Sequence, residues 1–238
     1  MKINKQNNVY TIIYIAILVI VVGAILAFTS MSLKDKQQAN ENIDKMKQIL
    51  ASVHISASDK NIEELYHEMI TETLVVNSQG KIIGSNAFDI NVQEESKIKD
   101  VAKRKLPVYI CDIKGVGRKY ILPVAGSGLW GPIWGYVAVD DNGSTIYGAY
   151  FAHQAETPGL GAEIEKPAFS NQFDGKEMFK GGQFLPVAVI KKGQKAPNGE
   201  DYVDAVSGGT ITSKGVSAML SDCLSPYKVY LEHLSPSL

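Results

Sequence analysis

The stretch DAVSGGTITS, residues 204–213, places a threonine hydroxyl directly after two glycines. The glycines allow a sharp turn and a close approach of the backbone to a ligand. Thr212 and Ser213 are good N-cap residues for the following run KGVSAMLSDCL, in which apolar side chains recur at helical spacing. A helix start offers free N–H groups and the positive end of the helix dipole, which both favour a phosphate. Spacing alone therefore permits two interpretations: a phosphate site beside Thr210, or a glycine turn before a capped helix.

Two earlier glycine-rich stretches could supply an apolar or aromatic surface for a ligand. GSGLWGPIWGYVAVD, residues 126–140, places Trp130 in a bend, where its ring could stack on a flat ligand, whereas Trp134 fits the core equally well. HQAETPGLGAEI, residues 153–164, directly follows a predicted strand. Its proline and glycines predict a tight loop, and spacing alone favours a simple connecting turn.

The pattern D-x-x-S-G-x-T resembles the flavinylation motif of bacterial FMN-binding domains. Asp204, Ser207, Gly208 and Thr210 match it residue by residue, and Gly209 stands where that family usually has alanine. In the family, a flavin transferase joins the phosphate of FMN to the hydroxyl of the last threonine. The resemblance implies FMN bound covalently to Thr210 by a phosphoester, with Asp204 taking part in recognition by the transferase.

The three stretches, in this order, are similar to one branch of that family, the C subunits of the Na+-translocating NADH:quinone oxidoreductase. This resemblance assigns Trp130, Glu156, Thr157 and Leu160 to the flavin pocket. Leu160 would lie flat against the ring, and Glu156 and Thr157 would contact the ring edge or the ribityl chain. The resemblance further implies an electron carrier that passes single electrons, with the other subunits of a membrane complex and the flavin transferase as partners.

Three other interpretations stay open. The flavin subunit of the related complex that couples ferredoxin to NAD shares the threonine motif, and an anchored binding module without flavin is also compatible with the sequence. A membrane-tethered hydrolase finds no support, because the chain has no nucleophile elbow and no Ser–His–Asp order. It also has neither a P-loop nor a Rossmann fingerprint, so we do not expect it to oxidise NADH by itself.

The composition is that of a globular protein. The chain has 238 residues, of which 45% are hydrophobic, and a net charge of −1. This hydrophobic share is enough to form a core. The sequence has no basic stripe interleaved with aromatic residues, so we do not expect it to bind nucleic acid. Cys111 and Cys223 are too few for a zinc or iron–sulfur site, and the four histidines share no ligand spacing. The two cysteines could form one disulfide, but two inert thiols are the favoured interpretation.

The segment VYTIIYIAILVIVVGAILAF, residues 9–28, carries no charge. As a helix it spans about 30 Å, the thickness of the hydrocarbon core of a bilayer. A signal peptide would have a shorter apolar region and a cleavage site of small residues, which AFTSMS does not offer. Lysines on both sides leave the orientation open. The short leader and the resemblance imply a single-pass inner-membrane protein whose soluble domain is periplasmic.

The rest of the chain predicts an α+β fold, an antiparallel or mixed sheet with flanking helices, preceded by the transmembrane helix. Strands are expected around the turns KGVG and DDNG, in the hairpin LVVNSQGKIIGS and in FLPVAVIKK. Helices are expected over 32–56, from Asn61, over 94–105 and from Tyr227. The expected domain boundaries are a leader (1–8), a transmembrane helix (9–28), a helical stalk with the first part of the soluble region (32–105) and an FMN-binding domain (106–238).

Overall fold

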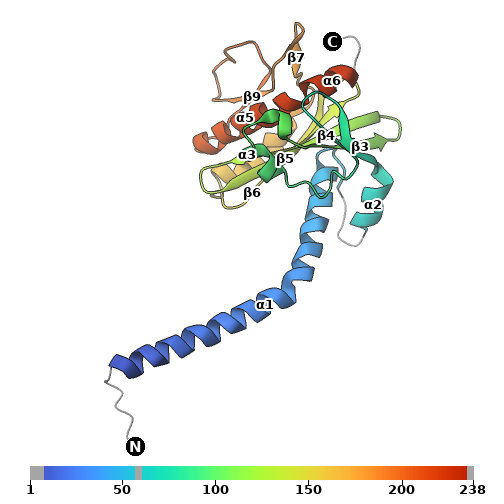
Figure 1. Ribbon diagram of the computed structural model, residues 1–238. Coiled ribbons are helices and arrows are strands. Elements are labelled where there is room, and N and C mark those ends of the chain that lie inside the picture. Colours follow the sequence, from blue (N-terminus) through green and yellow to red (C-terminus); the bar gives the residue numbers. More distant parts are fainter. Residues whose placement is uncertain (1–7, 57–60, 235–238) are drawn as a thin grey trace, which may run out of the picture. The chain divides into compact units, whose positions relative to one another are not determined.

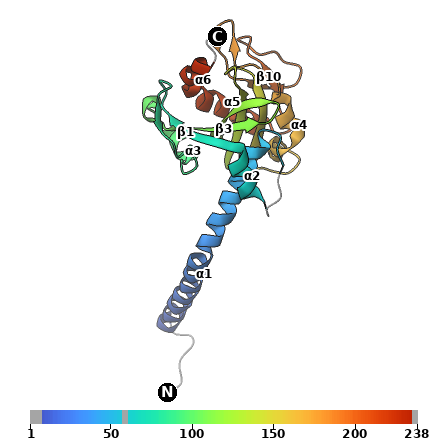
Figure 2. The same ribbon diagram turned by 90° about the vertical axis from the view of Figure 1, so that its right-hand side faces the viewer.

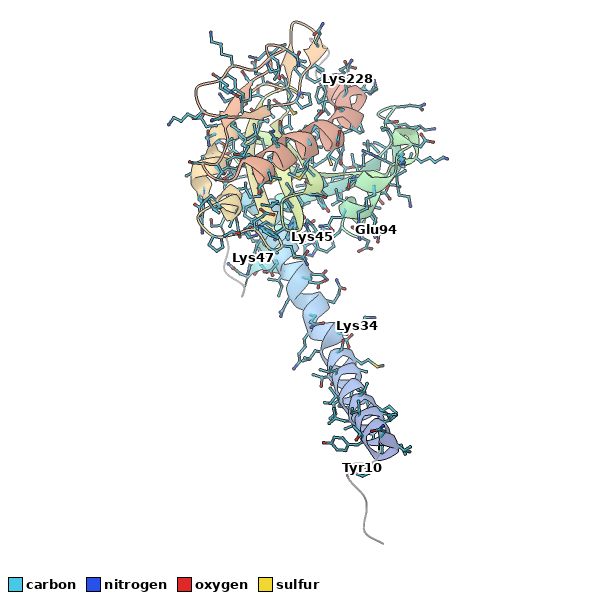
Figure 3. All side chains as sticks on the ribbon, turned by 90° about the vertical axis from the view of Figure 1, so that its left-hand side faces the viewer. Tyr10, Lys34, Lys45, Lys47, Glu94 and Lys228 are labelled. Atoms are coloured by element: carbon cyan, nitrogen blue, oxygen red, sulfur yellow. The ribbon has the colours of Figure 1, made fainter. Side chains whose placement is uncertain are left out.

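The computed structural model describes residues 8–56 and 61–234 (Figure 1). The chain divides into two units between Lys45 and Met46. Most of the long helix α1 (Asn8–Ala51) forms the first unit. By length and composition this helix could cross a membrane. Its side chains are exposed along the whole apolar part, and charged residues such as Lys34 and Lys45 follow farther along the helix (Figure 3). The predicted apolar helix and the predicted stalk are thus one continuous helix.

The second unit is built on a six-stranded antiparallel sheet with the order β2-β1-β3-β4-β5-β6. The turns KGVG and DDNG join neighbouring strands of this sheet, as their sequences predict. The predicted α+β class is therefore correct. The six strands are β1 (Ile70–Val76), β2 (Ile82–Gly84), β3 (Leu106–Ile113), β4 (Gly117–Ser127), β5 (Pro132–Asp140) and β6 (Ile146–His153).

Helices cover both faces of this sheet. Successive side chains of β5 point to opposite faces, so this strand contacts helices on both sides. Val137 and Val139 pack with Leu220 in the large core cluster beneath α5, which lies across the sheet (Figures 1 and 2). On the other face, Trp134 Nε1 donates a hydrogen bond of 2.9 Å to Gln48 Oε1 in the last turns of α1. The helices after α1 are α2 (Ile62–Met69), α3 (Val92–Lys97), α4 (Pro167–Ser170), α5 (Thr210–Leu224) and α6 (Lys228–Leu234).

Four 3-10 turns and two small sheets complete the described part of this unit. The turns lie at Val101–Lys103, Gly161–Glu165, Asn171–Phe173 and Ser225–Tyr227. One small sheet is the hairpin of β7 (Phe179–Lys180) and β8 (Gln183–Phe184), and the other pairs β9 (Ala188–Ile190) in parallel with β10 (Tyr202–Asp204). FLPVAVIKK therefore contributes the end of β8 and the short strand β9, both outside the main sheet, partly because Pro186 has no N–H to donate to a ladder.

The charged stretch 94–105 does not form the predicted helix. Asn91 starts α3 earlier, because its side chain accepts hydrogen bonds from Gln93 N and Glu94 N. The helix ends at Lys97, and the chain then turns back. Arg104 fixes this return, since its guanidinium donates to the carbonyls of Ile98, Ser96 and Asp222.

The sheet continues across the domain boundary expected between residues 105 and 106. Strand β1, which precedes that boundary, pairs with β3 along six residue pairs from Ile70 to Val76, and both belong to the unit that begins at Met46. The hairpin of β1 and β2 buries Leu74 and Val76 in the core cluster. The stretch 70–84 is therefore part of the same sheet as the rest of the domain.

Cys111 and Cys223 are both free and buried. Burial raises the pKa of the Cys111 thiol to about 11 and also raises the pKa of Cys223. We expect a disulfide-exchange reagent at neutral pH to titrate neither thiol in the folded chain and both after unfolding in urea. Detection of no thiol in the unfolded chain would indicate a disulfide and contradict this assignment.

Candidate functional site

The motif residues leave the small β9–β10 sheet and lead directly into α5. Asp204 is the last residue of β10, and its N–H donates to Gln172 Oε1 (2.9 Å). Gly208 adopts a φ of +75°, which only glycine takes without strain, and Ser207 beside it is exposed. Helix α5 then begins at Thr210 itself, which is exposed, with Gly209 at the N-cap position. The Thr210 hydroxyl therefore lies at the surface, at a helix start.

Thr212 and Ser213 are not N-caps, contrary to the sequence prediction. Both lie in the first turn of α5 and are buried. Thr212 Oγ1 donates to Glu156 Oε2 (2.5 Å), and Ser213 Oγ accepts from Val206 N (3.0 Å). Gly209 has no side chain with which to cap the helix, and within the described residues no side chain bonds to the free N–H groups of its first turn. This helix start can still accept an anion.

The loop after β6 brings Glu156 against the start of α5. Glu156 is only 5% exposed, and its Oε1 accepts a hydrogen bond of 2.8 Å from the backbone N–H of Trp130. The close approach needs glycine on both sides. A methyl group on Gly128 would lie 2.5 Å from Glu156 Oε1, and one on Gly161 would lie 2.3 Å from Oε2. The three stretches that the sequence singled out therefore meet at one carboxylate.

Leu160 lies against the glycines of the motif. A methyl group on Gly208 would lie 2.6 Å from Leu160 Cδ2, and one on Gly209 would lie 3.3 Å from Gly161 Cα. The carbonyl of Thr157 accepts from Leu160 N (3.1 Å) and closes the loop, while the Thr157 side chain is exposed. These contacts place the loop that carries Thr157 and Leu160 beside the segment that leads to Thr210.

Exposed apolar side chains surround this region. Trp130 is 65% exposed, Ile211 57% and Leu160 44%. At this exposure, their side chains are available to contact a ligand. Of the predicted site residues, the structure brings Trp130, Glu156, Thr157, Leu160 and Gly208–Thr210 together, and Asp204 and Ser207 lie just before them along the chain. The sequence analysis interpreted Thr212 as a helix cap and did not predict its hydrogen bond to Glu156.

Comparison with known proteins places these features in a family. Residues 128–225 match the FMN-binding domain family, and this range includes Trp130, Glu156 and Thr210. The C subunit of the Na(+)-translocating NADH-quinone reductase of Vibrio alginolyticus is 34% identical over 213 residues, which cover 83% of this chain and 82% of that protein. The chain belongs to this family of C subunits. The corresponding protein of Yersinia pestis is 32% identical over 232 residues, 90% of this chain and 87% of that protein.

Solved structures support membership of the C-subunit family. The crystal structure of the corresponding Na(+)-translocating NADH-quinone reductase protein from Parabacteroides distasonis is 47% identical, with a TM-score of 0.77, and covers 84% of this chain and 96% of that one. The corresponding protein from Shewanella oneidensis, at 23% identity and a TM-score of 0.68, shares the fold. The resemblance stated from the motifs is thereby confirmed, and so are the FMN-binding domain and the fold.

The residues of this C-subunit family member fit FMN. A phosphate needs N–H donors and positive potential, and the uncapped start of α5 offers both next to the Thr210 hydroxyl. An isoalloxazine ring needs flat apolar contacts, and the exposed side chains of Trp130 and Leu160 offer them. The turn at Gly208 and Gly209 keeps bulky side chains away from the space before the helix.

Proposed function

We propose that the chain carries FMN as a phosphoester on Thr210. In this proposal it is the C subunit of a Na+-translocating NADH–quinone reductase, where it relays single electrons. The observation that carries this proposal is the exposed Thr210 hydroxyl at an uncapped helix start, within a D-x-x-S-G-x-T motif. Its neighbours along the fold are the loop of Leu160 and the bend of Trp130, both exposed and apolar. The same site therefore offers a nucleophilic hydroxyl, a seat for a phosphate and a surface for a ring.

Each motif residue has a distinct task in this proposal. The N–H groups at the start of α5 hold the phosphate, while Gly208 and Gly209 let the backbone turn beside it. Ser207 and Asp204 precede the turn, and both are accessible enough to meet an enzyme that modifies the chain. We assign Asp204 to recognition by the flavin transferase and its metal. Ser207 shapes the segment that the transferase must bind.

Bound FMN supplies reversible one-electron chemistry, and the chain supplies attachment and orientation. Trp130 and Leu160 hold the ring between exposed apolar surfaces, and Thr157 offers its hydroxyl to the polar edge or the ribityl chain. A covalent bond keeps the cofactor in place on the periplasmic side, where lost FMN is not replaced. A carrier of this kind needs no acid or base in its own chain.

The anchor and the partners follow from α1 and from the family. Helix α1 holds the chain at the inner membrane, and the soluble domain lies in the periplasm. The partners of the chain are the other subunits of the reductase. The apolar part of α1 carries no ionisable side chain between Asn8 and Leu33 apart from Tyr10 and Tyr14, so this helix offers Na+ no charged ligand of its own. NADH oxidation, quinone reduction and Na+ transport therefore belong to other subunits. The relatives reported above favour this complex over the one that couples ferredoxin to NAD.

Flavin fluorescence on a denaturing gel tests the proposal. The full chain made together with a flavin transferase should give a fluorescent band at its own mass, and the chain made without the transferase should give none. The fluorescent chain should then copurify with NADH–quinone reductase activity from membranes. A dark band in both preparations would favour a binding module without flavin, and copurification with ferredoxin–NAD activity would favour the related complex.

The substitution Gly208→Ala should slow FMN attachment several-fold. The new methyl group would lie 2.6 Å from Leu160 Cδ2, so Leu160 must move away from the motif. The positive φ adds a strain of about 1–2 kcal/mol. Gly199→Ala is the matched control, because Gly199 has a φ of +83° and nothing within 4 Å of the added carbon. Both variants should lose similar stability in urea unfolding, but only Gly208→Ala should attach FMN slowly. Equal rates of FMN attachment would refute the close contact between Gly208 and Leu160.

A further inference from the structure

We infer that Glu156 is a positioning residue that joins the Trp130 bend to the first turn of α5. We infer further that this connection also forms in the flavin-free protein. The role of Glu156 in orienting the ring rests on the function proposed above, but the junction itself does not. The family resemblance expects Glu156 to contact the flavin. The structure shows a further role, because the side chain is only 5% exposed and both of its oxygens accept hydrogen bonds within the protein.

The two hydrogen bonds of the carboxylate connect segments far apart in the chain. Oε1 accepts from Trp130 N at 2.8 Å, across 26 positions, and Oε2 accepts from Thr212 Oγ1 at 2.5 Å, across 56 positions. Hydrogen bonds to an ionised acceptor are stronger than neutral ones, and burial strengthens them further. One side chain therefore fixes a bend between β4 and β5 to the helix that begins at Thr210.

The backbone around Glu156 is adapted to this junction. Glu156 N donates to His153 Nδ1 (3.2 Å), which fixes the main chain directly before the side chain. Gly128 and Gly161 leave room for the two carboxylate oxygens, and an added methyl on either glycine would lie within 2.5 Å of one of them. Gly128 N also donates to Gly131 O (2.8 Å), which closes the bend that presents Trp130.

This arrangement separates two parts of Trp130. Its indole is 65% exposed and free to meet a ligand, while its backbone N–H is tied to Glu156 inside the protein. Thr212 lies two residues after Thr210 on the same first turn. The positions of the indole and of the attachment hydroxyl are therefore set by the same carboxylate, one through each oxygen. Loss of the carboxylate should leave both elements present but no longer held in one geometry.

Amide hydrogen exchange of Trp130 in the flavin-free full chain, made without a transferase and kept in detergent, tests the junction. We expect Glu156→Ala to speed exchange of this amide about tenfold or more, and Glu156→Gln, which keeps an acceptor, to stay within about threefold of the original chain. Glu64→Ala is the control, because Glu64 is an exposed carboxylate on helix α2, outside the junction. Unchanged Trp130 protection in Glu156→Ala would overturn the proposal.

A second pair of variants covers the case in which Glu156→Ala does not fold. Thr212→Val keeps the buried shape without the hydroxyl and should also speed Trp130 exchange, whereas Thr212→Ser should restore the original rate. In the flavin-loaded chain, Glu156→Ala or Thr212→Val should change the visible circular dichroism of the flavin, and Glu64→Ala should not. If Thr212→Val left the exchange rate of the Trp130 amide unchanged, the junction would be refuted. A chain that takes up no flavin would refute only the proposed function.

Discussion

Replacing Thr210 with alanine is expected to abolish FMN attachment and to leave the free energy of unfolding nearly unchanged. The Thr210 side chain is exposed at the first position of α5, so its loss removes the nucleophile without opening a cavity. Alanine is also the better helix former by a few tenths of a kcal/mol. Intact mass spectrometry of the chain made with a flavin transferase should find the mass of one attached FMN in the original protein and none in Thr210→Ala.

Two variants control this result. Thr210→Ser keeps a hydroxyl at the same position and should retain attachment, at a reduced rate at most. Ser221→Ala removes a hydroxyl from an exposed position farther along α5 and should load like the original chain. Full loading of Thr210→Ala would show that another residue carries the flavin.

Gly161→Ala should lower the free energy of unfolding by about 3 kcal/mol. Its φ is not positive, so alanine fits the backbone, but the added methyl would lie 2.3 Å from Glu156 Oε2 and 2.5 Å from Thr212 Oγ1. It would occupy the space of the hydrogen bond between them. Losing a bond to a charged group costs about 1.5–3 kcal/mol, and overpacking a tight site adds about 1–3 kcal/mol. Urea unfolding of the flavin-free chain measures the sum.

The control for this prediction is Gly84→Ala in the exposed edge strand β2. A methyl there meets only Val75, at 3.7 Å, which is an ordinary contact. We expect its stability to change by less than about 0.5 kcal/mol. If Gly161→Ala were as stable as Gly84→Ala, the tight packing around the Glu156 carboxylate would be wrong.

Much of the fold followed from local patterns in the sequence. The turns KGVG and DDNG join antiparallel strands because glycine and asparagine favour the turn conformations that those strands need. The apolar helix was evident from its length without charge. The motif glycines indicated a turn before a helix, and Gly208 indeed has a φ of +75°. Local chemistry decides each of these features, so one sequence is enough to predict them.

The errors arose where a distant partner decides the outcome. Thr212 and Ser213 have the chemistry of caps, but their hydroxyls bond to Glu156 and Val206, so the helix begins earlier. Neither bond is visible in spacing along the chain. Spacing along the chain also gave no sign that Glu156 is buried between Gly128 and the start of α5, and its predicted contact with the flavin stays a prediction. Charge patterning likewise suggested one long helix over 94–105, although long-range bonds from Arg104 bring the chain back.

Fragmentation mass spectrometry of the flavin-bearing peptide tests the central claim most directly. The full chain is made with a flavin transferase, digested and sequenced in the spectrometer, which locates the phosphoester along residues 204–213. The account predicts FMN on Thr210 and on no other residue. A flavin on Ser207 or Thr212, or a chain that incorporates none when the transferase is active, would contradict it.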